Sequence, residues 1–129
     1  MTLLITAMTT AFIVPLYIWL AFRVINFRKR SKISFGDGED QDMLRRVRAH
    51  GNCAEYAPFG VLLLALNELS GTPTLILCGL ALLLVAGRVC HAYSFVHVPM
   101  NYTARTAGMA LTFAMLALSA LCLLIFNIA

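Results

Sequence analysis

The stretch RVRAHGNCAEYAPFG, residues Arg46–Gly60, decides the fold because it places polar groups at the beginning of an apolar segment. The apolar run that ends it, Ala57–Leu69, is too short to cross a bilayer, which takes about 20 residues. This run crosses only if its helix extends back through the polar stretch, although each charged side chain in hydrocarbon costs roughly 2.5–3.5 kcal/mol. Polar groups at such a place need a partner or a function. The groups concerned are Arg48, Asn52, Glu55 and Tyr56.

The rest of the chain has the composition of a membrane protein. Of its 129 residues, 60% are hydrophobic and only 12% are charged, and the mean hydropathy is +0.82. A soluble domain is about 45–50% apolar and about 25% charged. Three further segments are long enough to span a bilayer: Leu3–Phe22, Leu75–Val98 and Ala107–Ile128. We therefore predict one all-α membrane domain over residues 1–129, a four-transmembrane-helix bundle with helices at about 3–25, 40–69, 75–98 and 103–127.

The first apolar segment is expected to be a retained helix and not a cleaved signal peptide. No basic segment precedes it, and Arg23 and Asn26 follow it in place of an A-x-A cleavage pattern. The cysteines stand singly among apolar neighbours, without a CxxC pair, so we expect no metal site and regard them as small buried hydrophobic residues. They are Cys53, Cys78, Cys90 and Cys122.

The basic residues predict the orientation of the chain. They follow the first helix, open the second helix, and flank the turn between the third and the fourth. Lys and Arg beside membrane helices mark the cytoplasmic side. We therefore expect both termini and the Glu68–Thr74 turn outside, and the two longer loops inside. The pI of 9.1 reflects this asymmetry and does not indicate nucleic-acid binding, because no soluble basic surface is present to carry it.

The loop before the second helix carries its own turn and capping signals. Gly36 and Gly38 permit a tight turn. Acidic side chains follow at the expected helix N-terminus, where they accept hydrogen bonds from free N–H groups and complement the helix dipole. These side chains are Asp37, Glu39, Asp40 and Asp42. Later in the chain, Pro99 is expected to end the third helix.

On a helix, five polar residues of the second segment share one face. At about 100° per residue they cover roughly a quarter of the circumference. They are Arg45, Arg48, Asn52, Glu55 and Tyr56. Arg46 and His50 point elsewhere, toward the headgroups or a neighbouring helix.

The third and fourth helices add polar groups at a comparable depth. The third carries Arg88 and His91 with Tyr93 nearby, and the fourth opens with Arg105. We expect three helices to converge on a cationic, aromatic-lined pocket on the cytoplasmic side.

Two interpretations of this cluster compete. Glu55 could pair with Arg48 or Arg88 and simply hold the bundle together. Against this, one carboxylate cannot neutralise all four arginines of the cluster, so the surplus positive charge calls for an anionic ligand. Arginine binds carboxylates with two parallel hydrogen bonds, and Glu55 would suit an ammonium group. We therefore predict a small ligand with carboxylates and one amine.

The segments RVRAHGNCAEYAPF and GRVCHAYSF, followed by Arg105, carry a family resemblance over nearly the whole chain. The first resembles the R-x-x-x-N-x-x-E-Y signature of MAPEG, the membrane-associated proteins in eicosanoid and glutathione metabolism. The FGDG loop is most similar to that of small bacterial members, mostly of undefined substrate. Phe95 departs from the family by standing where a tyrosine is expected, which leaves Tyr93 as the nearest replacement for the hydroxyl.

The resemblance implies a left-handed-type bundle that assembles as a homotrimer, with glutathione bound as co-substrate between subunits and open to the cytoplasm. It implies that four residues hold the carboxylates and amine of glutathione: Arg48, Asn52, Glu55 and Tyr56. Arg28 or Arg30 of a neighbouring subunit would complete the site, and Arg88 or His91 would support it. Arg105 would stabilise the thiolate.

The implied function is that of a microsomal-type glutathione S-transferase of the bacterial inner membrane. A glutathione thiolate would attack a lipophilic electrophile that enters from the bilayer, or reduce a lipid hydroperoxide. Two alternatives belong to other classes: a small proton- or cation-coupled membrane transporter, and a catalytically silent glutathione-binding membrane protein. The surplus of arginine and the absence of an inverted repeat speak against the transporter. The generic Leu, Ala and Phe of the lipid-facing surface do not indicate the second substrate.

Overall fold

The structure, a computed structural model, describes residues 2–96 and 98–128, with side chains to residue 126. Within this part of the chain every regular element is an α-helix. The helices are α1 (Leu4–Ser31), α2 (Gln41–Leu69), α3 (Thr74–Ser94) and α4 (Tyr102–Ile128). The all-helical fold and the number of helices predicted from the sequence are therefore confirmed.

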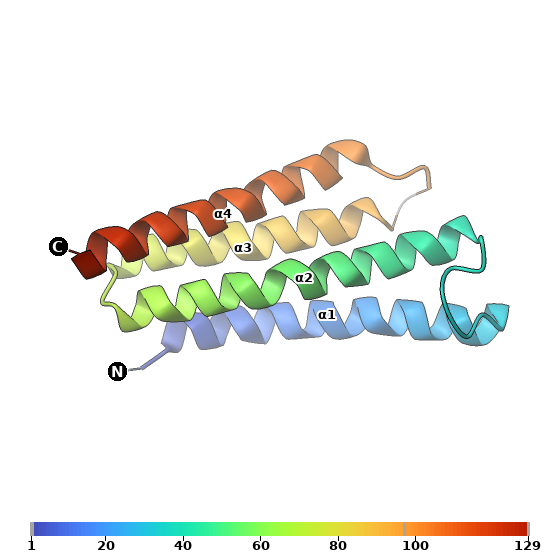
Figure 1. Cartoon of the computed structure of the whole chain (residues 1–129), viewed down its shortest axis with the longest axis horizontal. Coiled ribbons are helices and arrows are strands. Elements are labelled where there is room, and N and C mark those ends of the chain that lie inside the picture. Colours follow the sequence, from blue (N-terminus) through green and yellow to red (C-terminus); the bar gives the residue numbers. More distant parts are fainter. Residues whose placement is uncertain (1, 97, 129) are drawn as a thin grey trace.

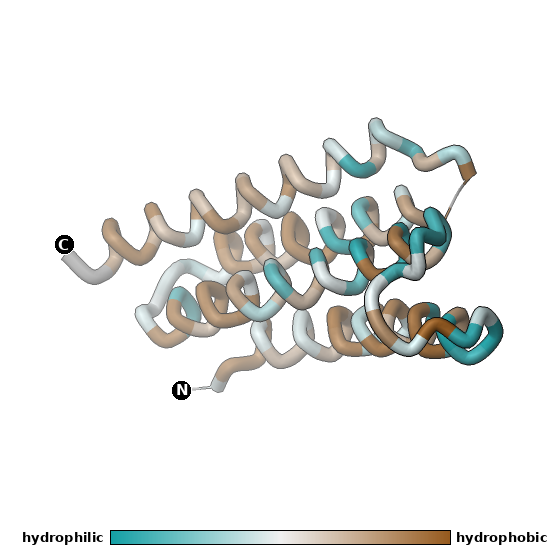
Figure 2. The backbone as a smooth tube through the Cα atoms, turned by 45° about the vertical axis from the view of Figure 1, so that its right-hand side comes forward, coloured by the Kyte–Doolittle hydropathy of each residue, from teal (hydrophilic) through white to brown (hydrophobic). Residues whose placement is uncertain are grey.

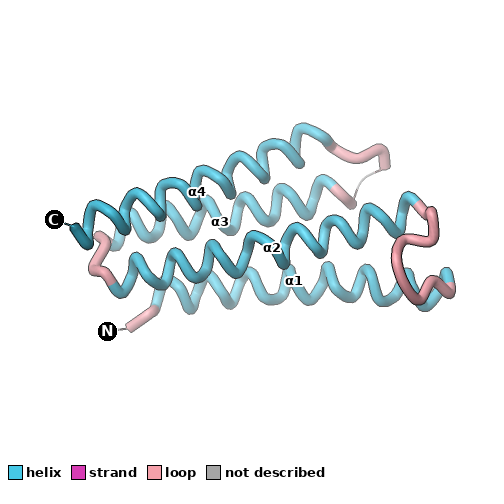
Figure 3. The backbone as a smooth tube through the Cα atoms, in the orientation of Figure 1, coloured by secondary structure: helices cyan, strands magenta, loops and turns pink. Residues whose placement is uncertain are grey.

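The four helices run alternately up and down along one axis (Figure 1). Both chain termini and the α2–α3 turn, residues 70–73, lie at one end, which we call the terminal end. The α1–α2 loop, residues 32–40, and the α3–α4 loop lie at the opposite end, which we call the loop end (Figure 3). α2 and α3 pack against each other; α1 packs on both of them, as does α4, whereas α1 and α4 do not approach each other.

Three helices, α1, α3 and α4, are long and apolar enough to cross a membrane. α2 is as long but is polar in its first half, and it runs alongside the others (Figures 1 and 2). Most of the strongly hydrophilic residues lie toward the loop end (Figure 2). The basic residues that the sequence places beside the helix ends therefore belong mainly to one end of the bundle, the loop end (Figure 2).

Two helix ends differ from the expected bounds. α1 continues to Ser31 and not to residue 25, because arginine and lysine lower the hydropathy of a segment without lowering its helix propensity. α3 ends at Ser94 and not at residue 98. Pro99 disfavours a helical conformation at Val98, the residue before it, and the N–H of Asn101 donates to the Ser94 carbonyl at 3.1 Å, which closes the connection to α4.

The expected cap of α2 is present. Asp40 is the N-cap residue, and its carboxylate accepts from the N–H groups of Asp42 and Met43 at 2.8 and 2.9 Å. Gly36 and Gly38 both have positive φ, 62° and 60°, as the turn requires. The loop therefore delivers the polar half of α2 into the bundle at the loop end.

A close contact between two glycines sets the spacing of α3 and α4. A Cβ atom on Gly87 would lie 2.6 Å from the Thr112 hydroxyl, and one on Gly108 would lie 2.5 Å from the backbone nitrogen of His91. Small residues let helix backbones approach in this way. The polar residues next to Gly87 on α3 are consequently pressed against α4.

Candidate functional site

A cavity of about 460 Å³ lies at the loop end, between the beginnings of α2 and α4 and the loop that precedes α4. Its size is in the range of small-molecule sites. The residues that line it are Gln41, Leu44, Arg45, Arg48, Phe95, Val98, Pro99, Met100, Tyr102 and Arg105. Three of the arginines singled out in the sequence, Arg45 and Arg48 of α2 and Arg105 of α4, thus meet at one cavity.

Only one of these three arginines has an acidic partner in the described chain. Arg45 forms an ion pair with Asp42, one turn earlier on α2. Arg48 and Arg105 are exposed, and no carboxylate of the described residues lies within ion-pair distance of either. The Arg105 guanidinium lies 5.7 Å from the centre of the Phe95 ring. The cavity therefore presents two positive charges that are free to bind an anion.

Arg88 lies deeper and is almost completely buried, with 2% of its surface exposed. Its guanidinium donates to the Thr112 hydroxyl twice, from Nη2 at 2.6 Å and from Nε at 3.1 Å. Nη1 donates to the Asn52 side-chain oxygen at 2.7 Å. Arg88 therefore joins α2, α3 and α4 through neutral acceptors, and no described carboxylate compensates its charge.

Two residues of the predicted polar face of α2 serve this buried arginine. The Asn52 side-chain oxygen accepts from Arg88, and the Tyr56 ring lies 5.7 Å from the Arg88 guanidinium carbon. The edge of the Phe113 ring packs on Tyr56 with ring centres 5.5 Å apart. Within one chain, Asn52 and Tyr56 thus orient Arg88, and the amide nitrogen of Asn52 remains available to a ligand.

Glu55 is turned away from this network. It is exposed, and it forms an ion pair with neither Arg48 nor Arg88. The interpretation in which Glu55 holds one bundle together by pairing with either arginine is therefore not supported. The polar residues of this helical face therefore have different surroundings: Asn52 and Tyr56 contact the buried Arg88, Arg48 lines the loop-end cavity, and Glu55 is exposed without lining it.

His91 follows Arg88 by one turn on α3 and precedes Phe95, a residue of the cavity wall, by another turn. It is buried, and its ring centre is 5.1 Å from that of Phe95, which lines the cavity. His91 therefore connects the two parts of the predicted cluster. Tyr93 is half exposed on the outer surface of α3 and does not line the cavity.

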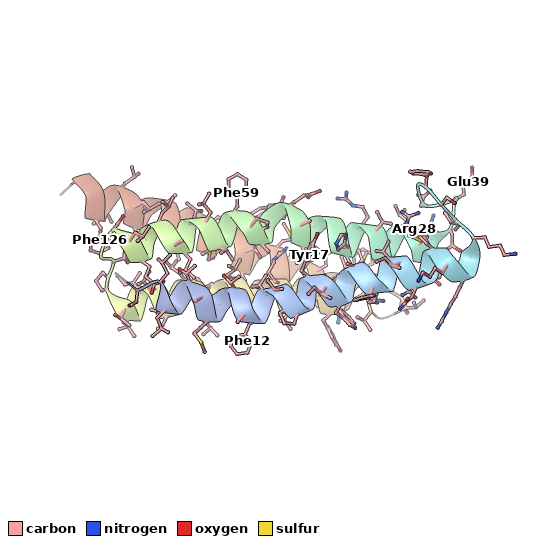
Figure 4. All side chains as sticks on the ribbon, turned by 90° about the horizontal axis from the view of Figure 1, so that it is seen from below. Phe12, Tyr17, Arg28, Glu39, Phe59 and Phe126 are labelled. Carbon is pink, nitrogen blue, oxygen red and sulfur yellow. The ribbon has the colours of Figure 1, made fainter. Side chains whose placement is uncertain are left out.

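The two α1 arginines expected to act from a neighbouring subunit lie away from the cavity of their own chain. Arg28 donates to the carbonyls of Ile33 and Gly36 at 3.3 and 3.0 Å and so holds the α1–α2 loop (Figure 4). Arg30 is exposed in the last turn of α1. Their expected action across a subunit boundary stays a prediction.

Sequence reasoning missed Thr112, whose hydroxyl accepts hydrogen bonds from Nε and Nη2 of Arg88. A signal was available, because Arg105, Gly108 and Thr112 lie at intervals of three and four on α4 and therefore share a face. In residues 2–96 and 98–128 no three His, Cys, Asp or Glu side chains gather in a group that could hold a metal ion.

Comparison with known proteins agrees with this architecture. The family model described as "MAPEG family" matches residues 6–125. The inner membrane protein YecN of Escherichia coli K12 is 34% identical over 103 residues, which cover 78% of this chain and 76% of YecN. YecN of Escherichia coli O6:H1 matches to the same extent. From the family match over nearly its whole length, we conclude that the chain belongs to the MAPEG family.

Proposed function

We propose that the protein binds glutathione at the loop-end cavity and activates its thiol for reaction with lipophilic electrophiles. The observation that carries the proposal is the pair of arginines, Arg48 and Arg105, that face a cavity of about 460 Å³ with no carboxylate partner among the described residues. Glutathione brings two carboxylates, one ammonium group and a thiol. The guanidinium groups suit the anionic ends of this molecule, and the exposed Glu55 suits its ammonium group.

Arg105 is the proposed catalytic residue. It stands in the first turn of α4, where the positive end of the helix dipole also favours a negative charge. The preceding Asn101 caps this helix by accepting from the N–H of Ala104 at 3.0 Å. A thiol has a pKa near 8.5, and nearby positive charge lowers it. Because arginine remains protonated, Arg105 acts by stabilising the thiolate and not by removing the proton, which passes to solvent.

The reaction then follows from the thiolate. In conjugation, sulfur forms a bond to the electrophilic carbon, and the leaving group departs with its electron pair. In the peroxidase variant, two glutathione molecules reduce one lipid hydroperoxide to the alcohol and water and are oxidised to the disulfide. The electrophile reaches the site from the bilayer, since the helices that surround it are apolar on their outer surfaces.

The functional assembly is proposed to be a homotrimer. Arg48 and Glu55 are charged, lie on α2 within the bundle length, and are exposed in the single chain. A neighbouring subunit that covers them would remove them from lipid and bring Arg28 or Arg30 to the ligand. Native mass spectrometry in detergent is expected to give trimers; a distribution of monomers and dimers would contradict the proposal.

The loop end is proposed to face the cytoplasm of a bacterial inner membrane. YecN is an inner membrane protein, and the basic residues that flank the helices gather at the loop end. Labelling of single cysteines introduced at Ser34 and at Ser70 in intact cells tests this orientation. Reagents that do not cross the membrane should reach position 70 and not position 34.

The ultraviolet absorbance of the thiolate tests the proposed activity. Glutathione added to the purified protein at neutral pH should produce an absorbance that corresponds to about one thiolate per binding site. Addition of an aryl halide should remove this absorbance as product forms. Calorimetric binding without thiolate absorbance or turnover would identify a silent glutathione-binding protein. Absence of any binding would contradict the proposed site altogether.

A further inference from the structure

A second cluster of positive charge lies on the opposite side of α2, at the packing surface with α1. Arg46 of α2 reaches across to α1 and packs on the ring of Phe27, one turn after Arg23, so the two arginines lie at the same level of the α1–α2 packing surface. Each is held by an aromatic ring: the Arg23 guanidinium is 5.0 Å from the Trp19 ring centre, and that of Arg46 is 4.8 Å from the Phe27 ring centre. Neither arginine lines the loop-end cavity.

The cluster contains unused hydrogen-bonding groups. Arg23 Nη1, Arg46 Nε and His50 Nε2 are buried and have no hydrogen-bond partner among the described residues. No described carboxylate forms an ion pair with either arginine. Buried donors that lack a partner are costly, and two like charges held together without a counter-ion add to this cost. The arrangement is therefore incomplete without an anion.

An apolar groove continues from the cluster toward the terminal end. His50 packs against Tyr17 with ring centres 4.8 Å apart. Tyr17, whose side chain lies between α1 and α2 (Figure 4), also lines a cavity of about 500 Å³ between these helices. Its walls are almost entirely apolar and include Ile13, Ala57 and Val61. A cationic end and an apolar slot thus follow one another along the helix axis, within the length of the bundle.

We propose that this surface binds an anionic phospholipid of the leaflet at the loop end, with its phosphate on Arg23 and Arg46 and one acyl chain in the α1–α2 groove. A phosphate has enough acceptor oxygens for two guanidinium groups. Basic pockets between membrane helices near the headgroup region bind anionic lipid headgroups. The apolar groove selects a lipid over a free phosphate, because it offers an acyl chain an apolar surface next to the charge.

Native mass spectrometry of the full-length chain in detergent tests this proposal. With equal amounts of dioleoyl phosphatidylglycerol and dioleoyl phosphatidylcholine, we expect the anionic lipid to be retained about tenfold more. The double variant Arg23→Gln/Arg46→Gln should retain the two lipids about equally. The matched control Lys29→Gln/Lys32→Gln removes the same charge from exposed positions at the same end and should keep the preference. Equal loss in both double variants would overturn the proposal.

Two further measurements locate the acyl chain and do not depend on the arginine variants. Ala65→Phe fills the far end of the groove and should weaken binding of the dioleoyl lipid but not of dihexanoyl phosphatidylglycerol. In the unaltered protein, inorganic phosphate in large excess should leave the dioleoyl lipid bound. If phosphate displaces the lipid completely, the cluster is a simple anion site. If the protein forms a lipid-free oligomer and the Arg23→Gln/Arg46→Gln variant does not, the cluster is a contact with a second copy. Either result would overturn the proposal.

Discussion

The two ends of the bundle bury polar side chains in opposite ways. At the terminal end, the Glu68 carboxylate accepts from the N–H groups of Ile5 and Thr6 at 2.9 and 2.8 Å and from the Thr6 hydroxyl at 2.7 Å. The Asn67 amide donates to the Ser119 carbonyl at 3.1 Å, and its oxygen accepts from the Thr72 hydroxyl at 3.1 Å. These side chains from α1, α2 and the turn satisfy one another.

At the loop end, there are more positively charged groups than acidic partners and hydrogen-bond acceptors to pair with them. Arg48 and Arg105 have no acidic partner in the described chain, and Arg23 and Arg46 retain buried nitrogen atoms without hydrogen bonds. The terminal end therefore holds the helices together by closed hydrogen bonding, whereas the loop end leaves charge for ligands. Substitutions at the terminal end should change stability alone, and those at the loop-end cavity should change binding or rate.

The largest expected effect is on glutathione binding by Arg48→Ala. A hydrogen bond to a charged group contributes about 1.5–3 kcal/mol, so affinity should fall at least about tenfold in calorimetry. The melting temperature in detergent should change little, because Arg48 is exposed and has no described acidic partner. Lys29→Ala, another exposed cation of the loop end, is the control and should bind normally. Unchanged affinity in Arg48→Ala would remove this residue from the site.

Thr112→Val tests the buried arginine that joins three helices. The substitution keeps the shape of the side chain but leaves two Arg88 donors without their acceptor, which should cost about 1–3 kcal/mol of stability. Thr112→Ser keeps the hydroxyl and should lose less. Thermal unfolding in detergent compares the two variants. If they are equally stable, the bonds to Arg88 do not contribute to the stability of the bundle.

Arg105→Ala should change the chemistry more than the binding. Removal of a positive charge destabilises the thiolate and therefore raises the pKa of the bound thiol, by about one pH unit if the charge contributes about 1.4 kcal/mol. At neutral pH the rate with a model aryl halide should fall about tenfold and recover as the pH rises. Arg105→Lys keeps the charge and should restore part of the rate. A pH–rate profile identical to that of the unaltered protein would place the thiolate beside another cation, with Arg88 the next candidate.

The smallest expected effect is at the terminal end. Glu68→Ala removes the acceptors that cap α1 and should cost about 1 kcal/mol, as loss of a helix cap does. Glu68→Gln keeps one oxygen and should cost less. Glutathione affinity should be the same in both variants, because Glu68 lies at the opposite end from the cavity. A change in affinity would show that the two ends are coupled.

The sequence by itself determined the helices and the direction of the charge asymmetry. Apolar length predicted the four helices, the run of acidic residues before the second helix predicted a cap that the structure assigns to Asp40, and the positions of Lys and Arg predicted their gathering at one end. The bounds of α1 and α3 were less accurate, since hydropathy marks where apolarity ends and not where the helix ends. The comparable depth of the polar groups on the second and fourth helices suggested that they meet, and the structure places Arg48 and Arg105 at one cavity.

Only the tertiary structure decided which polar groups meet. Helical spacing places Asn52, Glu55 and Tyr56 on one face, but it does not determine how α2 is rotated about its axis relative to α3 and α4. In the bundle this rotation turns Asn52 and Tyr56 to Arg88 and leaves Glu55 outside. The placement of Arg46 against Phe27, one turn after Arg23 on α1, depends equally on the register of α1 against α2. Side-chain packing between helices sets rotation and register, and no pattern within a single helix contains that information.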